Sequence, residues 1–175
     1  MTVKLSQTES AVRTAARWVL PGLIAGLVFA MWAMVVGIFT SNVWAPPQGI
    51  AQSVGIGTQG HNFQLVPFVL GLMGHMVNSV IIGIIFITIA RAVHLRGVGA
   101  VIGGMVWGVI AYVGMYRVVL RVLLASTSAS FLSANPEWSW IAGHLMYGVV
   151  LGALVAYGPL RDPHLQARRR PALAA

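Results

Sequence analysis

Two histidines stand in matching surroundings within hydrophobic stretches of the chain. Residues 74–83 align with residues 143–152, where glycine, histidine, valine and glycine fall at the same four offsets, so that His75 corresponds to His144. An ionisable side chain in a membrane span is costly, faces the bundle interior and marks a functional site. The pattern predicts an internal duplication that carries a paired polar site.

Each histidine shares a helix face with other small or polar residues. Because residues three or four apart lie together on a helix, Asn78 and Ser79 accompany His75, and Trp140 and Tyr147 accompany His144. These stripes are expected to point at neighbouring helices. At roughly 1.5 Å per residue, both histidines lie about 25 Å from the inner ends of their spans, which predicts one shared level in the outer part of the bilayer.

Two arginines add charge near that level. Arg117 and Arg121 lie four residues apart at the outer end of the third span, and Glu137 is the one acidic residue in the outer connections. We expect one arginine to pair with Glu137. The other is free for a lipid phosphate, a partner's carboxylate or an acidic group of a ligand, which the guanidinium fork suits. Simple anchoring at the membrane interface is the alternative.

Three uses of the histidine pair are open. The first is structural, since interhelical polar contacts in membranes contribute ~0.6 kcal/mol on average. The second is b-type haem, with the two histidines ligating iron from both faces and Arg117 and Arg121 holding the propionates. The third is a metal or proton route, for which Met73, Met76 and Met146 would suit Cu(I). The lack of Asp and Glu within the spans argues against a proton pump.

The remaining histidines and the motif content point away from catalysis. His61 and His94 fall in connections and His164 in the C-terminal tail, where we expect them to be solvated. The chain holds no paired carboxylates, no nucleophile with a nearby base, no phosphate-binding loop and no zinc spacing. The sequence therefore predicts a protein that is not an enzyme.

Composition places the chain in the membrane. It is 58% hydrophobic and 8% charged, with a mean hydropathy of +0.83, whereas a soluble domain carries about 25% charged residues. Four uncharged apolar stretches approach the ~20 residues that a helix needs to cross the hydrocarbon layer. They cover residues 18–39, 65–90, 98–116 and 140–157. We predict an all-α integral membrane four-helix bundle built from two repeated two-helix hairpins, forming one domain over residues 18–158.

Charge predicts the orientation. Nine of the eleven basic residues lie before the first span, between the second and third, or after the fourth. The positive-inside rule then places both termini and the middle connection in the cytoplasm, as a multi-pass protein of the bacterial inner membrane. Residues 1–17 and 159–175 become cytoplasmic tails, the first with an amphipathic helix at the surface. No structured basic surface for nucleic acid is evident, and the arginines at 168–170 are expected to contact lipid.

Small residues recur at helical spacing. Glycines of the first span match glycines of the third at a constant offset, and Gly148 and Gly152 form a GxxxG pair in the fourth. Such stripes let helix backbones approach closely in lipid, so they predict packing within the bundle. A homodimer face and a surface for a flat cofactor ring are the alternatives.

The outer connections lie between the paired spans. Residues 40–64 carry prolines and glycines, which predict a loop or a short interfacial helix. Residues 117–139 contain a serine-rich stretch, and the third span can continue as helix through Leu124 before it. Among the spans we expect Pro67 alone, near one end, to interrupt a helix, which weakens the case for a small-solute transporter with broken helices.

Three short motifs carry a resemblance. They are the Gly-Leu-Ile-Ala-Gly run at 22–26, the Trp-Ala-Pro at 44–46, and the histidines that precede glycine-rich runs, His75 and His144. In these the chain resembles uncharacterised four-helix bacterial inner-membrane proteins. The resemblance implies fold and location but no activity, and proteins of this kind also occur as accessory subunits of larger complexes.

The sequence thus predicts a small structural or accessory membrane subunit with a paired-histidine site near the outer face. A b-type haem electron carrier is the first alternative and a small-solute transporter the second. The expected partners are the lipid bilayer, other membrane subunits or a second copy of the chain.

Overall fold

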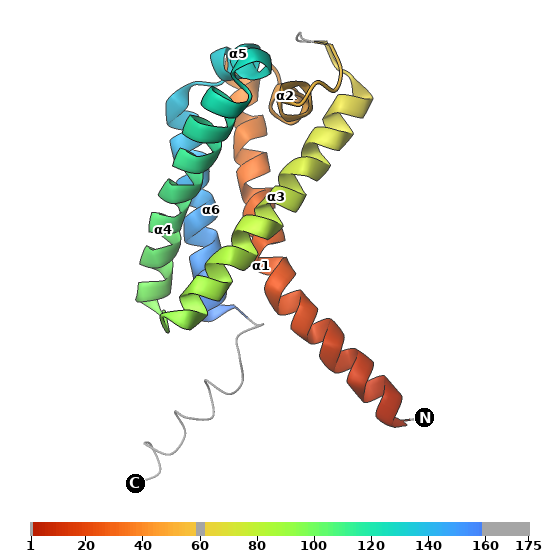
Figure 1. The fold of residues 1–175 in the computed structure, drawn as a ribbon, viewed down its shortest axis with the longest axis vertical. Helices are drawn as coiled ribbons and strands as arrows, with labels where there is room; N and C mark the ends of the chain where they lie inside the picture. Colours follow the sequence, from red (N-terminus) through yellow and green to blue (C-terminus); the bar gives the residue numbers. More distant parts are fainter. Residues whose placement is uncertain (1, 59–61, 159–175) are drawn as a thin grey trace.

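The computed structural model describes residues 2–58 and 62–158, and their regular structure is entirely helical. Four long apolar helices confirm the predicted all-α membrane bundle (Figure 1). The elements are α1 (Thr2–Thr40), α2 (Ala45–Ser53), α3 (Leu65–Ala92), α4 (Val98–Tyr112), the π-helix η1 (Val113–Leu123), α5 (Ala125–Ala134) and α6 (Glu137–Tyr157). The predicted tail at 159–175, His61 and His164 lie outside the described residues.

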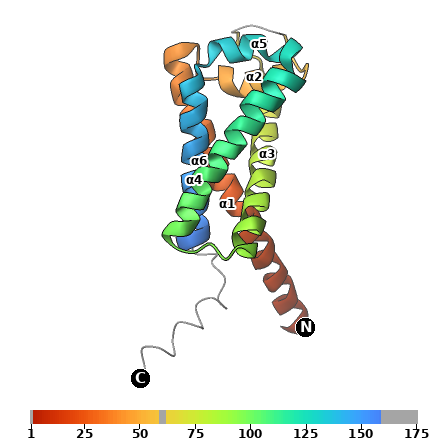
Figure 2. The same cartoon turned by 60° about the vertical axis from the view of Figure 1, so that its left-hand side comes forward.

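The long helices pack in the order α3, α1, α6, α4. Helix α1 contacts both α3 and α6, and α6 contacts α4 along its length. The backbones of α3 and α4 meet near the turn at 93–97 and then diverge, and the indole Nε1 of Trp107 bridges them by donating to the Ile82 carbonyl at 3.2 Å. The short helices α2 and α5 lie across one end of the bundle (Figure 2), and Figure 1 shows that α3 and η1 stand farthest apart at this end.

Glycines make the α4–α6 contact. A Cβ placed on Gly104 or Gly108 would collide with backbone atoms of α6, and one on Gly148 or Gly152 would collide with backbone atoms of α4. The two small-residue stripes therefore face each other, as close helix packing in lipid requires. The packing interpretation is confirmed, and these stripes are not free to form a homodimer face.

A second close contact joins α1 to α3. A Cβ on Gly22 would lie 2.8 Å from the Ser79 carbonyl oxygen, and one on Gly83 would lie 2.8 Å from the Gly22 Cα. Gly26 packs on the Ser79 side chain in the same way. Because these glycines bring the two backbones together, α1 and α3 are in direct contact beside His75.

The turn between α3 and α4 ends α3 with a Schellman motif. The Leu95 N–H bonds to the Ala90 carbonyl at 2.8 Å, and the His94 N–H bonds to the Arg91 carbonyl at 3.2 Å. His94 adopts the left-handed conformation (φ 57°) that glycine usually fills. It is exposed, so its role is conformational and it lies apart from the other two histidines.

Two expectations about the first span were wrong. Helix α1 begins at Thr2 and continues into the span, so residues 2–17 form no separate surface helix. Pro21 also lies inside α1, so Pro67 is not alone in a span. Membrane helices tolerate proline where neighbouring groups satisfy the freed carbonyl, and Pro67 stands in the first turn of α3 where no N–H is needed.

The third span differs from a regular α-helix in its outer half. From Val113 the chain forms a π-helix, which ends with a bond from the Leu124 N–H to the Val119 carbonyl at 2.8 Å. Tyr116 and Leu120 fill its buried face. Long π-helical stretches are rare. The third span is therefore not a regular α-helix throughout, so the regularity of the spans does not argue against a transporter.

The proposed duplication stays a prediction. Both halves follow the order long helix, short helix, long helix. The first half consists of α1, α2 and α3, and the second consists of α4 with η1, then α5 and α6. Their contacts are not equivalent, because α1 packs closely on α6 whereas the matching pair, α4 and α3, touches at few positions.

Candidate functional site

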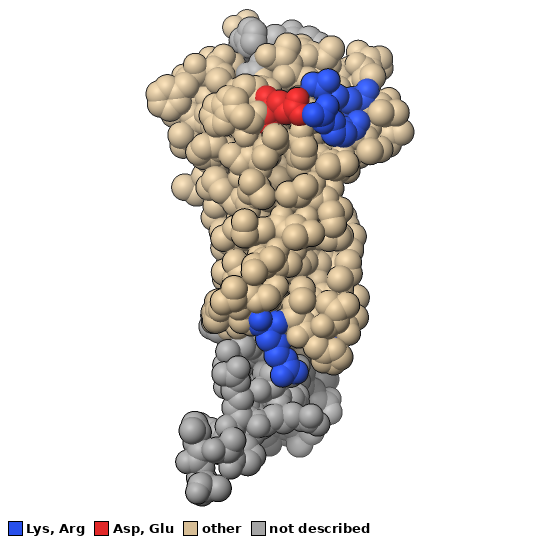
Figure 3. Space-filling model, turned by 90° about the vertical axis from the view of Figure 1, so that its left-hand side faces the viewer, with Lys and Arg blue, Asp and Glu red and all other residues tan. Residues whose placement is uncertain are grey.

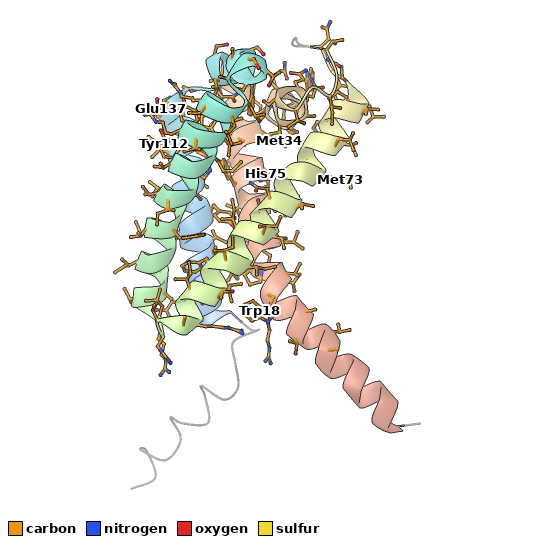
Figure 4. All side chains as sticks on the ribbon, viewed as in Figure 1. Trp18, Met34, Met73, His75, Tyr112 and Glu137 are labelled. Carbon is orange, nitrogen blue, oxygen red and sulfur yellow. The ribbon has the colours of Figure 1, made fainter. Side chains whose placement is uncertain are left out.

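The two sequence-predicted histidines meet around one phenylalanine. Phe29 of α1 lies edge-on to both imidazoles, with ring centroids 5.3 Å from His75 and 4.7 Å from His144. Helix α1 lies between the two histidine-bearing helices, so its aromatic side chain reaches both. Figure 4 shows His75 directed from α3 toward the bundle interior. The structure thus brings the pair together at one level, as their depths predicted.

Hydrogen bonds to carbonyl oxygens set the tautomer of each imidazole. His75 Nε2 lies 2.9 Å from the Gly26 carbonyl oxygen, and His144 Nδ1 lies 2.8 Å from the Trp140 carbonyl oxygen. A carbonyl oxygen can only accept, so the proton sits on Nε2 of His75 and on Nδ1 of His144. In the neutral imidazole the other ring nitrogen then keeps a lone pair.

The predicted polar neighbours of the histidines make hydrogen bonds both between helices and within one helix. The Tyr147 hydroxyl donates to the Ser79 carbonyl at 2.6 Å, which joins α6 to α3. The Ser79 hydroxyl instead donates within its own helix, to the His75 carbonyl at 2.8 Å. Asn78 Nδ2 lies 3.7 Å from Met115 Sδ across the gap to η1, a weak partner for an amide.

Trp140 extends the site on the side of α5. Its ring stacks on His144 with centroids 6.3 Å apart and contacts Tyr116 at 5.4 Å and Phe131 at 5.2 Å. Its Nε1 is buried and has no hydrogen-bond partner within residues 2–58 and 62–158, whereas a buried indole N–H usually finds one.

A cavity of about 220 Å³ adjoins these residues beneath α2 and α5. Its wall is mainly apolar, from α1, α3, η1, α5 and α6. The polar side chains on the wall are those of His75, Asn78, Ser79, Asn135, Ser139, Trp140, His144 and Tyr147.

The two arginines form a separate cluster on the surface of η1 and α6. Glu137 accepts from the Tyr112 hydroxyl and from Arg117, and Arg121 lies 3.8 Å from its other carboxylate oxygen. Arg121 also donates to the Tyr116 hydroxyl at 2.9 Å. Figure 3 shows the acidic and basic atoms side by side near the α2–α5 end, and Figure 4 shows Tyr112 beside Glu137. Both arginines thus share Glu137, where the sequence suggested one.

This arrangement does not fit a haem held between the histidines. Two axial imidazoles must face each other across the flat macrocycle, each directing a nitrogen at the iron. Here the Phe29 ring lies edge-on against both imidazoles, where the macrocycle would have to pass. Arg117 forms an ion pair with Glu137 and so is already engaged by a carboxylate of this chain.

Met73 does not join the histidines in the Cu(I) site that the sequence suggested. Met73 is 59% exposed and points outward from α3 (Figure 4). The sulfur of Met76 lies instead toward Gly26 of α1. Across residues 2–58 and 62–158, no three His, Cys, Asp or Glu side chains gather as metal ligands.

Phe29 is a site residue that the sequence interpretation missed, whereas Trp140 was placed on the helix face of His144. A lone aromatic in an apolar helix carries no signal of its own, because every face of such a helix is hydrophobic. Trp140 did carry one, since it precedes His144 by four residues and therefore shares its helix face.

No family model, curated protein or solved structure matches this chain. The fold and the site together define its class as an all-α membrane protein with four long apolar helices and an aromatic–histidine cluster.

Proposed function

We propose that this protein is a small, non-enzymatic integral membrane protein that acts as a structural or accessory subunit of a membrane complex. The observation that carries the proposal is that its polar side chains form hydrogen bonds between its own helices. His75 bonds to Gly26 and Tyr147 to Ser79, and Trp32 Nε1 donates to the Ser139 carbonyl at 3.0 Å. These bonds hold its own helices together.

The outward faces support the same role. Large apolar side chains are exposed along every long helix, for example Met31 on α1, Val77 on α3, Val106 on α4 and Ile141 on α6. Such faces suit contact with lipid or with other membrane-spanning subunits. The described chain outside the long helices amounts to two short helices and brief connections.

The proposed location is the bacterial inner membrane with both termini cytoplasmic. The end of the bundle opposite α2 and α5 carries Arg91, whose guanidinium lies 4.2 Å from the centroid of the Trp18 ring. Tryptophan and arginine are typical of a membrane interface, and the excess of basic residues favours the cytoplasmic side. A reporter fused after Ala175 is expected to read as cytoplasmic, and a periplasmic signal would overturn the orientation.

Native mass spectrometry tests the accessory role. The protein is extracted from its own membranes in mild detergent, and the mass of the assembly is compared with the 18.6 kDa of one chain. We expect a fixed stoichiometry with at least one different membrane subunit. A monomer, or a homodimer without other subunits, in several detergents would contradict the proposal.

A further inference from the structure

The cavity beneath α2 and α5 has the size of one substituted ring. An engineered cavity of about 150 Å³ lined by apolar residues holds benzene, and pockets for drug-sized molecules start at about 300 Å³. The volume of about 220 Å³ lies between these values. A six-membered ring with a few small substituents therefore matches the space.

The polar atoms on its wall are suited to a hydroxyl group. His144 is only 5% exposed and lines the cavity, and its Nε2 keeps a lone pair with no hydrogen-bond partner among the described residues. His75 keeps a lone pair on Nδ1 in the same wall. The Trp140 ring lines the cavity as an apolar and aromatic surface. A hydroxyl can donate to an imidazole nitrogen.

The cavity is partly open to the surface. Gly74 and Val54 line it and are themselves exposed. Gly74 lies ten residues into α3, which is one of the apolar helices long enough to span a membrane. The opening at Gly74 thus faces the hydrocarbon, so an occupant arrives from the bilayer and must dissolve in it.

We propose that this cavity binds a membrane-soluble molecule whose head group is a single hydroxylated aromatic ring. The ring occupies the apolar space beside Trp140 and Phe29, and a hydroxyl donates to the free nitrogen of His144. An alkyl tail leaves through the opening at Gly74. This binding site goes beyond the accessory role, because a chain without partner subunits would still bind the ligand.

A matched pair of probes tests the hydrogen bond. 4-Pentylphenol and 4-pentylanisole have nearly the same shape, but only the phenol carries an O–H. Binding to the full-length protein in lipid nanodiscs is measured by calorimetry, with empty nanodiscs subtracted. We expect saturable binding of the phenol at about one molecule per chain, and at least tenfold weaker binding of the anisole.

A matched pair of glycine variants tests the location. A Cβ on Gly74 would meet no atom within 4 Å, so Gly74→Leu fills the opening without a clash. A Cβ on Gly99 of α4 also meets no atom within 4 Å, and Gly99 does not line the cavity. We expect Gly74→Leu to weaken phenol binding at least tenfold and Gly99→Leu to leave it unchanged, with both variants melting close to the parent protein.

Three results would overturn the proposal. Non-saturable uptake equal to that of empty nanodiscs would mean partition into lipid only. Equal affinity for phenol and anisole would mean an apolar cavity for any acyl or alkyl group. Undiminished binding by Gly74→Leu would place the phenol elsewhere. The probe pair needs no variant, so it decides the question even if Gly74→Leu fails to fold.

Discussion

Replacing Gly104 by alanine should weaken the bundle more than the size of one methyl group suggests. A Cβ at this position would overlap the Gly148 carbonyl oxygen and lie 2.9 Å from the Gly152 Cα. Both obstacles are backbone atoms of α6, so no side-chain rotation can relieve the clash. The two helices must move apart along their shared interface.

The cost follows from the distances. Carbon atoms pack best at about 3.5–4.0 Å, so α4 must retreat from α6 by roughly 1 Å near Gly104. A gap of that size forfeits about a quarter to a half of each contact's attraction, and the interface runs the length of both helices. Overpacking of this kind costs about 1–3 kcal/mol of unfolding free energy.

The assay is equilibrium unfolding in mixed micelles, where sodium dodecyl sulfate is titrated against a mild detergent and helicity is followed by circular dichroism. Gly99→Ala is the matched control, because Gly99 lies on the same helix and a Cβ placed there meets no atom within 4 Å. We expect the control to stay within about 0.5 kcal/mol of the parent protein. Equal stability of the two variants would refute the claim that Gly104 sets the distance between α4 and α6.

Four further predictions concern other parts of the molecule. His94→Gly should raise the free energy of unfolding by about 1 kcal/mol in the same assay, since φ is 57° there; no gain would show that the turn carries no strain. Tyr147→Phe should lower it by about 0.6–1.7 kcal/mol through the lost bond to Ser79, and an unchanged value would mean that the bond adds nothing. Glu137→Gln should lower the melting temperature at low salt, and the difference should shrink at high salt because the Arg117 pair is half-exposed; a salt-independent loss would rule out an ion-pair origin. Protein made with ample haem should show no Soret band after purification, whereas a sharp α-band on reduction would contradict the Phe29 packing.

The presence of the four long helices and several of their ends could be predicted from the sequence. Helix α3 begins at Leu65, α4 begins at Val98 and α6 ends at Tyr157, as expected, whereas α1 begins at Thr2 and not at residue 18. The physical reason is that an apolar run of about 20 residues has few alternatives in lipid, where every backbone polar group must bond within its own helix. The glycine stripes were also readable, because close packing in lipid demands small residues.

The irregular parts could not be predicted. The π-helical geometry of η1 depends on how Tyr116 and Leu120 fit against neighbouring helices, and no residue propensity encodes it. Helix α2 did carry a signal, since Pro46 and Pro47 stand in its first turn, where proline is favoured. The burial of α2 could not be predicted. The Gln48 side chain is only 1% exposed, and its amide bonds to the backbone of the connection at 62–64, which is distant in sequence.

The candidate site was predicted in part. Helical spacing placed His75 and His144 on inward faces and at one depth, and the hydrogen bond of Tyr147 to α3 follows from the same face argument. The spacing could not show that Phe29 of a third helix reaches both imidazoles. Which helices are neighbours is a tertiary property, so the choice between ligand and packing roles needed the structure.

The order α3, α1, α6, α4 is a row and not a closed ring. If the chain were cut in the turn at 93–97, each fragment would keep a complete unit of two long helices and one short helix. The fragments would then be held together chiefly through α1 and α6, and also where α2 packs on α5. The bonds from Tyr147 to Ser79 and from Trp107 to Ile82 are smaller additions. The protein is therefore suited to split expression, in which two separately translated halves recombine in the membrane through these two helix pairs.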